Sequence, residues 1–165
     1  MRPLYRRIAA DIAAGTPKGA RVLDIGTGPG RLLVELGRLR PDLDLTGVDP
    51  SEEMVRISNG HLGAYGDRAR AVAGGVADLP FPDDSFDLVV TSFSMHHWPD
   101  VAAGVAEIAR VLRPDGHLGV YDFNRAPFDA LTSAAAEHAP LAGRAARRTR
   151  MPSRLPFHLV ARVAI

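Results

Sequence analysis

Residues 21–30 read RVLDIGTGPG, a short apolar segment that runs directly into glycines at alternate positions. Val22, Leu23 and Ile25 favour a buried strand over residues 21–25. The glycines allow a tight turn that a ligand can approach closely, because no Cβ stands in the way. Residues 31–40 then carry leucines on one helical face, at positions 32, 36 and 39, and end before Pro41. The stretch therefore predicts a strand, a glycine turn and a helix.

The same alternation continues along the chain. Further helices are expected where apolar residues recur at helical spacing: along Leu4, Ile8 and Ile12, after the N-cap candidate Ser51, and along Val101, Val105, Ile108 and Leu112. Further strands are expected over residues 43–48, 70–73, 86–93 and 117–123. Strands that alternate with helices favour right-handed crossovers. The predicted fold class is α/β, a doubly wound, mainly parallel Rossmann-like sheet with helices on both faces.

The composition excludes several classes of protein. A formal net charge of +1 argues against a surface that follows nucleic-acid phosphates. The absence of cysteine excludes disulfides, thiolate zinc sites and a cysteine nucleophile within these residues. No apolar run approaches the roughly 18 residues that cross a bilayer, and none follows the basic start at residues 1–7. We expect a soluble, cytoplasmic protein with no nucleic-acid partner and no membrane span.

The spacing of the glycines discriminates between ligands. Gly26, Gly28 and Gly30 follow G-x-G-x-G, whereas dinucleotide-binding loops follow G-x-G-x-x-G. Asp24 precedes the turn, and its charge would repel a pyrophosphate but suits a ligand with an ammonium group. Asp49 lies at the carboxyl end of the next predicted strand, about 20 residues after Gly30, where an acid can accept hydrogen bonds from ribose hydroxyls. These features favour a nucleoside ligand that carries an amine rather than a pyrophosphate.

Residues 22–30 resemble the first motif of class I S-adenosylmethionine-dependent methyltransferases. The resemblance continues in order, over roughly residues 4–123, through residues 47–54, 77–87, 96–98 and 110–116. These later segments are similar to the small-molecule branch, which includes ubiquinone-type methyltransferases. The resemblance implies S-adenosylmethionine as the cofactor, a ligand with an amino acid moiety and no phosphate. It also implies a small-molecule methyl acceptor.

The resemblance assigns roles around the glycine turn. Gly26, Gly28 and Gly30 are expected to line the cofactor. Asp24 is expected to orient the loop and the methionyl amine, directly or through water. Asp49 is expected to bind the ribose.

It also assigns roles around the adenine and the methionyl end. Met54 is expected against adenine, with a plain core position as an equal alternative. Asp78 is expected to accept from the adenine N6 amine and the Leu79 N–H to meet a ring nitrogen, although Asp78 could be only a turn residue. Ser92 and Phe93, at the end of a predicted strand, are expected to border the methionyl end.

Catalysis by such a protein needs little beyond alignment, because the cofactor carries the reactive methyl group. A hydroxyl acceptor would also benefit from a general base, and His96 and His97 are the neutral-pH candidates near the predicted cofactor edge. Packing under the following helix is the alternative for either histidine. No metal site is expected, because no third ligand is spaced to join the pair.

The chain length of 165 residues suits one domain. Residues 1–125 are expected to form the cofactor-binding Rossmann-like core, and residues 126–165 a shortened C-terminal part with a helix over 127–138 and a strand over 157–165. Residues 145–151 are too rich in arginine for a buried strand. We therefore expect a sheet of roughly six strands in a monomer, or a last strand exchanged between two copies in a homodimer.

Two further functions remain open at this stage. The first is a non-enzymatic or partner-dependent S-adenosylmethionine-binding module, because the lid before the first helix and the end of the fold are poorly recognisable. The second is an NAD-dependent oxidoreductase. The glycine spacing and Asp24 disfavour it, and Lys18 is the single lysine, so a Tyr-x-x-x-Lys pair is absent. The arginine-rich segment 144–154 is expected to be a solvated helix end, a disordered segment or the rim of a site for an acidic substrate.

Overall fold

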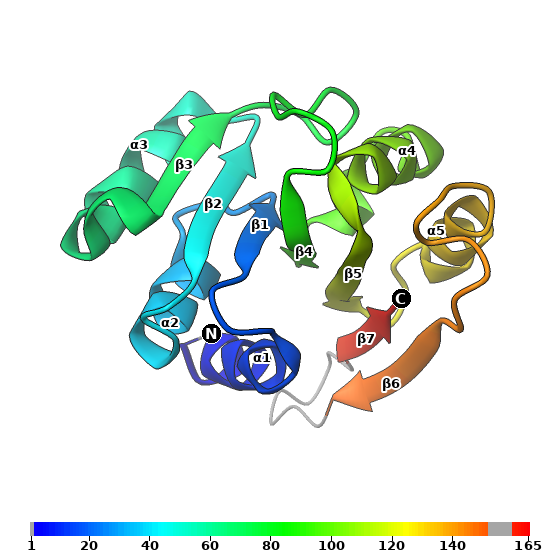
Figure 1. Cartoon of the computed structure of the whole chain (residues 1–165), viewed down its shortest axis with the longest axis horizontal. Coiled ribbons are helices and arrows are strands. Elements are labelled where there is room, and N and C mark those ends of the chain that lie inside the picture. Colours follow the sequence, from blue (N-terminus) through cyan, green and yellow to red (C-terminus); the bar gives the residue numbers. More distant parts are fainter. Residues whose placement is uncertain (1, 152–159) are drawn as a thin grey trace.

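The computed structural model describes residues 2–151 and 160–165. Its sheet has seven strands in the order β3-β2-β1-β4-β5-β7-β6, with helices on either side (Figure 1). The helices are α1 (Arg2–Gly15), α2 (Arg31–Leu39), α3 (Glu52–Leu62), α4 (Val101–Val111) and α5 (Phe128–Ala135), with short 3-10 helices η1 (Gly63–Arg68) and η2 (Met95–His97). The strands are β1 (Arg21–Ile25), β2 (Asp44–Asp49), β3 (Ala69–Ala73), β4 (Phe86–Ser92), β5 (Leu112–Phe123), β6 (Arg147–Met151) and β7 (Val160–Ala164).

The pairing confirms the predicted α/β class. The strands β1 to β5 pair in parallel, and β7 is antiparallel to both β5 and β6. Parallel strands place their carboxyl ends at one edge of the sheet, where their connecting loops gather. That edge is where the glycine turn follows β1.

Two apolar clusters lie on opposite faces of the sheet. One contains buried residues of α1, α2 and α3 with Val22 of β1, and the other contains those of α4 and α5 with Leu23 of the same strand. Adjacent residues of a strand point to opposite faces, so the alternation in β1 assigns each helical layer to its own face. Asp24 therefore points to the same face as Val22, toward the first three helices.

Two expectations about helix and strand ends were wrong. Leu39 is 40% exposed at the end of α2, while Leu33 is buried, so the apolar face of this helix is turned relative to the prediction. The fifth strand begins at Leu112 rather than at residue 117, because a register shift against β4 accommodates the segment between Leu112 and His117. Among the described residues, no helix is long and apolar enough to cross a membrane.

The largest correction concerns the C-terminal part. Residues 147–151 form β6, and the sheet has seven strands rather than six. The argument from arginine content failed because β6 is an edge strand whose residues 147–150 are exposed, so it has no buried face to fill. Charged side chains on an edge strand also oppose pairing with other chains. The predicted last strand is present as β7 beside β5, while residues 157–159 of the predicted range lie outside the described residues.

Candidate functional site

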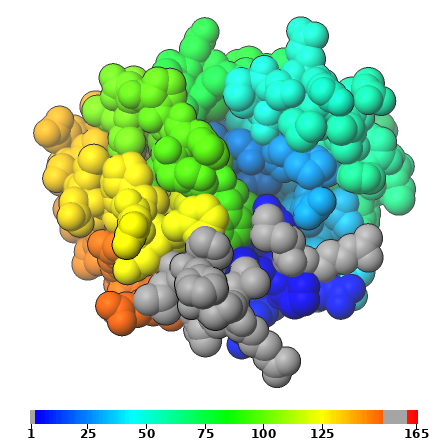
Figure 2. Space-filling view, turned by 180° about the vertical axis from the view of Figure 1, so that it is seen from behind, coloured from blue at the N-terminus to red at the C-terminus, as the bar shows by residue number. Residues whose placement is uncertain are grey.

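The carboxyl ends of β1, β2 and β4 define the candidate site. The strand β1 lies between β2 and β4, so the strand order reverses at this point of the sheet. In open α/β sheets, ligands bind in the crevice that such a reversal leaves outside the strand ends. Figure 2 shows a hollow on the back face of the molecule, between the green and cyan segments, with blue residues at its floor.

The three glycines of the turn serve different purposes. All have a positive φ, at 67° for Gly26, 52° for Gly28 and 74° for Gly30. Residues that carry a side chain rarely adopt this backbone conformation. A Cβ on Gly26 would lie 2.0 Å from the Ser94 Oγ, and one on Gly30 would lie 2.4 Å from the Ser58 Oγ. A Cβ on Gly28 would meet no atom within 4 Å. Gly26 and Gly30 therefore allow close internal packing, whereas Gly28 faces open space in which a ligand can lie.

Asp24 is fully buried beneath this turn. Its Oδ2 accepts a hydrogen bond from the Thr27 hydroxyl at 2.8 Å, while its Oδ1 has no partner. Burial raises the pKa of Asp24 to about 7, against the opposing effect of the Thr27 hydrogen bond and with a further contribution from the charge of Asp49. A buried carboxylate oxygen without a donor is costly. It fits a ligand that brings a positively charged, hydrogen-bonding group.

Asp49 connects the glycine turn to the start of α3. Its Oδ2 accepts from the Gly28 N–H at 2.8 Å, and its Oδ1 accepts from the Ser51 N–H at 3.0 Å. Ser51 caps α3 as predicted, since its hydroxyl accepts from the Met54 N–H. The carboxylate thus contacts the main chain of Gly28, and the partly buried Met54 is the third residue of α3.

The segment after β3 is only partly available to a ligand. Asp78 is exposed, and its N–H donates to the Gly75 carbonyl. Leu79 is 3% exposed and donates its N–H to the Glu107 Oε2 at 2.8 Å. This amide therefore already has a partner, so the expectation that it meets an adenine ring nitrogen would require Glu107 to move.

An aromatic group follows the end of β4. Ser92 is buried, and Phe93 has a positive φ of 56° while its N–H donates to the Tyr121 carbonyl. The Phe93 ring packs edge-on against Tyr5 of α1, at 6.0 Å between centroids, and lies 5.3 Å from the Phe123 ring. Tyr5 was not among the predicted site residues, because a helical pattern of apolar residues gives no sign that one of them faces a strand end.

The predicted histidines differ in their surroundings. The His96 Nδ1 lies 2.8 Å from the Asp122 Oδ1, and the His96 N–H donates to the Asp122 Oδ2 at 3.1 Å. Asp122 is fully buried near the end of β5, and its Oδ1 also accepts the Phe123 N–H. His97 is exposed, with its ring 4.0 Å from that of His96.

Asp122 escaped the sequence analysis, although it carries a readable signal. It is an acid near the end of the otherwise apolar run HLGVYDF at residues 117–123. A buried carboxylate needs hydrogen-bond donors, and Asp122 accepts hydrogen bonds from the main-chain N–H groups of His96 and Phe123. Within the described parts of the chain, no group of three or more His, Asp or Glu side chains could hold a metal ion.

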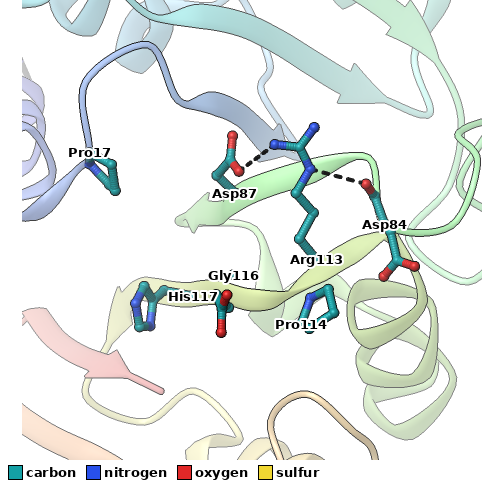
Figure 3. Close-up of a pocket in the computed structure, with 8 residues that line it drawn as sticks. Pro17, Asp84, Asp87, Arg113, Pro114, Gly116 and His117 are labelled. Carbon is teal, nitrogen blue, oxygen red and sulfur yellow. Dashed lines mark hydrogen bonds and ion pairs between the residues drawn. The ribbon is translucent and has the colours of Figure 1, made fainter.

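A cavity of about 450 Å³ lies at the opposite edge of the sheet (Figure 3). Its walls come from the amino ends of the strands: Pro17 before β1, Asp87 early in β4, and the first half of β5. Arg113 fills one side of it, donating to the Asp87 Oδ1 at 2.6 Å and to the Asp84 carbonyl at 3.3 Å. This cavity contains none of the predicted site residues.

The fold and the glycine site are those of a class I, Rossmann-like methyltransferase domain that uses S-adenosylmethionine. Residues 22–116 match the family described as "Methyltransferase domain", and the chain belongs to this family. The predicted resemblance and the predicted cofactor are thereby confirmed at the level of the family.

Similar proteins point to the same branch. A demethylmenaquinone methyltransferase of Roseiflexus castenholzii is 40% identical over 119 residues, covering 72% of this chain and 49% of the relative. A demethylmenaquinone methyltransferase of Deinococcus radiodurans is 36% identical, covering 72% of this chain and 48% of the relative. A proposed S-adenosyl-L-methionine-dependent methyltransferase of Methanococcus maripaludis has a TM-score of 0.69 at 30% identity, covering 82% of this chain and 62% of that structure. The chain spans about half the length of the curated relatives it matches.

Proposed function

We propose that this chain binds S-adenosylmethionine at the carboxyl edge of its sheet and transfers a methyl group to a small-molecule acceptor. The observation that carries the proposal is the buried Asp24 carboxylate, whose Oδ1 has no partner, beneath a turn in which Gly28 faces open space. A ligand with both an ammonium group and a ribose satisfies this site better than a dinucleotide does, because a pyrophosphate would be repelled by Asp24 and Asp49.

Most of the predicted binding residues have a distinct part in this proposal. Asp24 holds the methionyl amine, and Asp49 accepts from the ribose hydroxyls beside the open face of Gly28. Met54 and Asp78 contact the adenine, and Ser92 and Phe93 border the methionyl end. S-adenosylmethionine supplies an activated methyl group, so the protein contributes mainly alignment of the acceptor.

We assign to His96 the removal of a proton from the methyl acceptor. Asp122 accepts from other donors through both of its oxygens, so it acts as an ionised acceptor and fixes the proton of the His96 ring on Nδ1. The Nε2 atom is then left as the proton acceptor. His96 is therefore the general base and Asp122 its positioning residue, an arrangement suited to an acceptor that loses a proton as it is methylated.

Binding is tested by isothermal titration with S-adenosylmethionine, S-adenosylhomocysteine and NAD. We expect micromolar binding of the first two and no heat with NAD, whereas binding of NAD alone would refute the proposal. The family match leaves the oxidoreductase alternative without support. Cytoplasmic location and the absence of a nucleic-acid partner remain predictions of the sequence.

A second candidate function is S-adenosylmethionine binding without catalysis, because the features that carry the proposal, at Asp24, Gly28 and Asp49, concern binding alone. Release of S-adenosylhomocysteine upon addition of phenols and hydroquinones distinguishes the two, since a binding module releases none. If turnover occurs, His96→Gln and Asp122→Asn should lower kcat and leave the affinity for S-adenosylhomocysteine unchanged. His97→Gln is the matched comparison, because its ring has no carboxylate partner among the described residues.

A further inference from the structure

An arginine–glutamate pair lies in the last turns of α4, behind the segment that follows β3. The Arg110 guanidinium donates to both Glu107 oxygens, from Nε to Oε1 at 2.7 Å and from one terminal nitrogen to Oε2 at 2.8 Å. The side chains are only 32% and 20% exposed. Two parallel hydrogen bonds in a partly buried setting fix both planar groups relative to each other.

The pair binds the main chain of Leu79 on both sides. Glu107 Oε2 accepts the Leu79 N–H at 2.8 Å, and Arg110 donates to the Leu79 carbonyl at 3.0 Å. Arg110 also donates to the Phe81 carbonyl and to the Asp83 carboxylate, each at 2.8 Å. The hydrogen bond from Arg110, and secondly that from Leu79, hold the pKa of Glu107 below its usual range, so the acceptor stays ionised at neutral pH.

Residues 74–85 contain neither a helix nor a strand of the main sheet. Backbone hydrogen bonds attach this segment to the rest of the fold near its ends, at Gly74, Asp84 and Ser85. In its middle, the Leu79 main chain is held to α4 by the side chains of Glu107 and Arg110. The Leu79 side chain is buried in the α4 cluster, and Phe81 packs edge-on against Phe86. Asp78 immediately precedes the anchored residue. Its position at the carboxyl edge is therefore set by where the pair holds Leu79.

We propose that Glu107 and Arg110 are positioning residues for adenine recognition: they fix the Leu79 backbone so that Asp78 is presented to the 6-amino group of the base. The inference rests on the proposed function, since it deepens the account of the same cofactor site. Neither side chain contacts the ligand. Their effect is on which purine the site prefers.

The test compares Arg110→Lys with Arg113→Lys. Both arginines bind carboxylates and loop carbonyls, Arg110 two of each and Arg113 one of each, but Arg113 does so in the cavity at the other edge of the sheet (Figure 3). A lysine keeps the charge yet cannot span the several acceptors of a guanidinium. Each variant is titrated with S-adenosylhomocysteine and with its analogue whose purine lacks the 6-amino group.

The unsubstituted protein should prefer S-adenosylhomocysteine by about tenfold, the discrimination expected of one hydrogen bond. Arg110→Lys should lose most of this preference, and Arg113→Lys should keep it, even if both lower the melting temperature equally. Glu107→Ala should behave as Arg110→Lys does. If that variant does not fold, Arg110→Lys alone decides.

Two outcomes would overturn the inference. Unchanged discrimination in Arg110→Lys would show that the pair is only structural. Equal affinity of the unsubstituted protein for both ligands would show that Asp78 does not read the amino group, with S-adenosylmethionine binding itself still in place. Failure to bind either ligand would instead refute the proposed function.

Discussion

Asp24 accepts the Thr27 hydroxyl through Oδ2 at 2.8 Å and leaves Oδ1 without a partner, although the residue is completely buried. Thr27 itself lies within the glycine turn, so the carboxylate and the turn are held together. Burial raises the pKa of Asp24 to about 7, with the Thr27 hydrogen bond opposing the rise and the charge of Asp49 adding to it. Below about pH 7 the free protein therefore holds a proton here that a positively charged ligand would displace.

The affinity for S-adenosylhomocysteine should consequently depend on pH. An ammonium group stabilises the ionised carboxylate, so binding releases a proton wherever Asp24 is protonated in the free protein. We expect affinity to fall as pH drops below about 7, approaching tenfold per pH unit. Isothermal titration between about pH 8 and about pH 5.5 measures this slope.

Asp24→Asn is the control for this pH dependence of the affinity. It keeps the size and burial of the side chain but cannot ionise, so its affinity should be lower and should not follow this titration. Equal pH dependence in the two proteins would mean that another group titrates on binding. Asp24 would then be a structural residue of the turn.

Asp49→Ala should weaken binding of S-adenosylhomocysteine by roughly 1–3 kcal/mol through lost hydrogen bonds to the ribose. The same change removes the acceptor of the Gly28 and Ser51 N–H groups, so part of the loss would come from a looser turn. Asp42→Ala is a suitable control, because Asp42 also accepts a backbone N–H, that of Gly19, and lies outside the site. Unchanged affinity in Asp49→Ala would remove this residue from the site.

The sequence predicted the parallel core because local patterns there agree with the final packing. Residues 21–30 carry their own strand and turn signals, and Ser51 its own cap. Leu39 was misplaced because helical spacing does not define where an apolar face ends when a helix stops after nine residues. The strand at residues 147–151 was missed because an edge strand needs no apolar alternation.

The sequence predicted those site residues that lie within one recognisable segment, and it did not predict contacts between distant segments. Asp24, the glycines and Asp49 stand next to strand ends that the sequence reveals. Asp122 meets His96, and Glu107 meets Leu79, across separations of 26 and 28 residues. Such pairs depend on which strands and helices become neighbours in space, and no local pattern encodes that.

The glycines of the turn should respond differently to the same substitution. Gly28→Ala should leave a folded protein that binds S-adenosylhomocysteine poorly, because the new methyl group meets no protein atom but occupies the open space. Its positive φ costs roughly 1–2 kcal/mol. Gly26→Ala should destabilise the fold more strongly, since its Cβ would collide with Ser94.

Thermal unfolding by circular dichroism and a binding titration on the same samples separate these effects. Gly28→Val, with a larger side chain at the same position, should abolish binding. If Gly28→Ala unfolds as readily as Gly26→Ala, the role of Gly28 is conformational and gives no evidence of a ligand.

The last strand should contribute directly to stability. Within β7, Ala161 and Val163 are fully buried, and beyond it the Ile165 N–H and carbonyl exchange hydrogen bonds with Leu118 of β5 at 3.0 and 2.9 Å. Removing residues 160–165 would expose one edge of β5 and part of the core. We expect a markedly lower melting temperature, and a loss of roughly 1–3 kcal/mol for the milder Val163→Ala. Arg150→Ala, on the exposed edge strand β6, should change stability little.

Because β7 pairs within its own chain, size-exclusion chromatography should show no change from dimer to monomer on truncation. A truncated protein with an unchanged melting temperature would show that β7 is not part of the sheet in solution, and a dimer that dissociates would show that the strand is exchanged between copies.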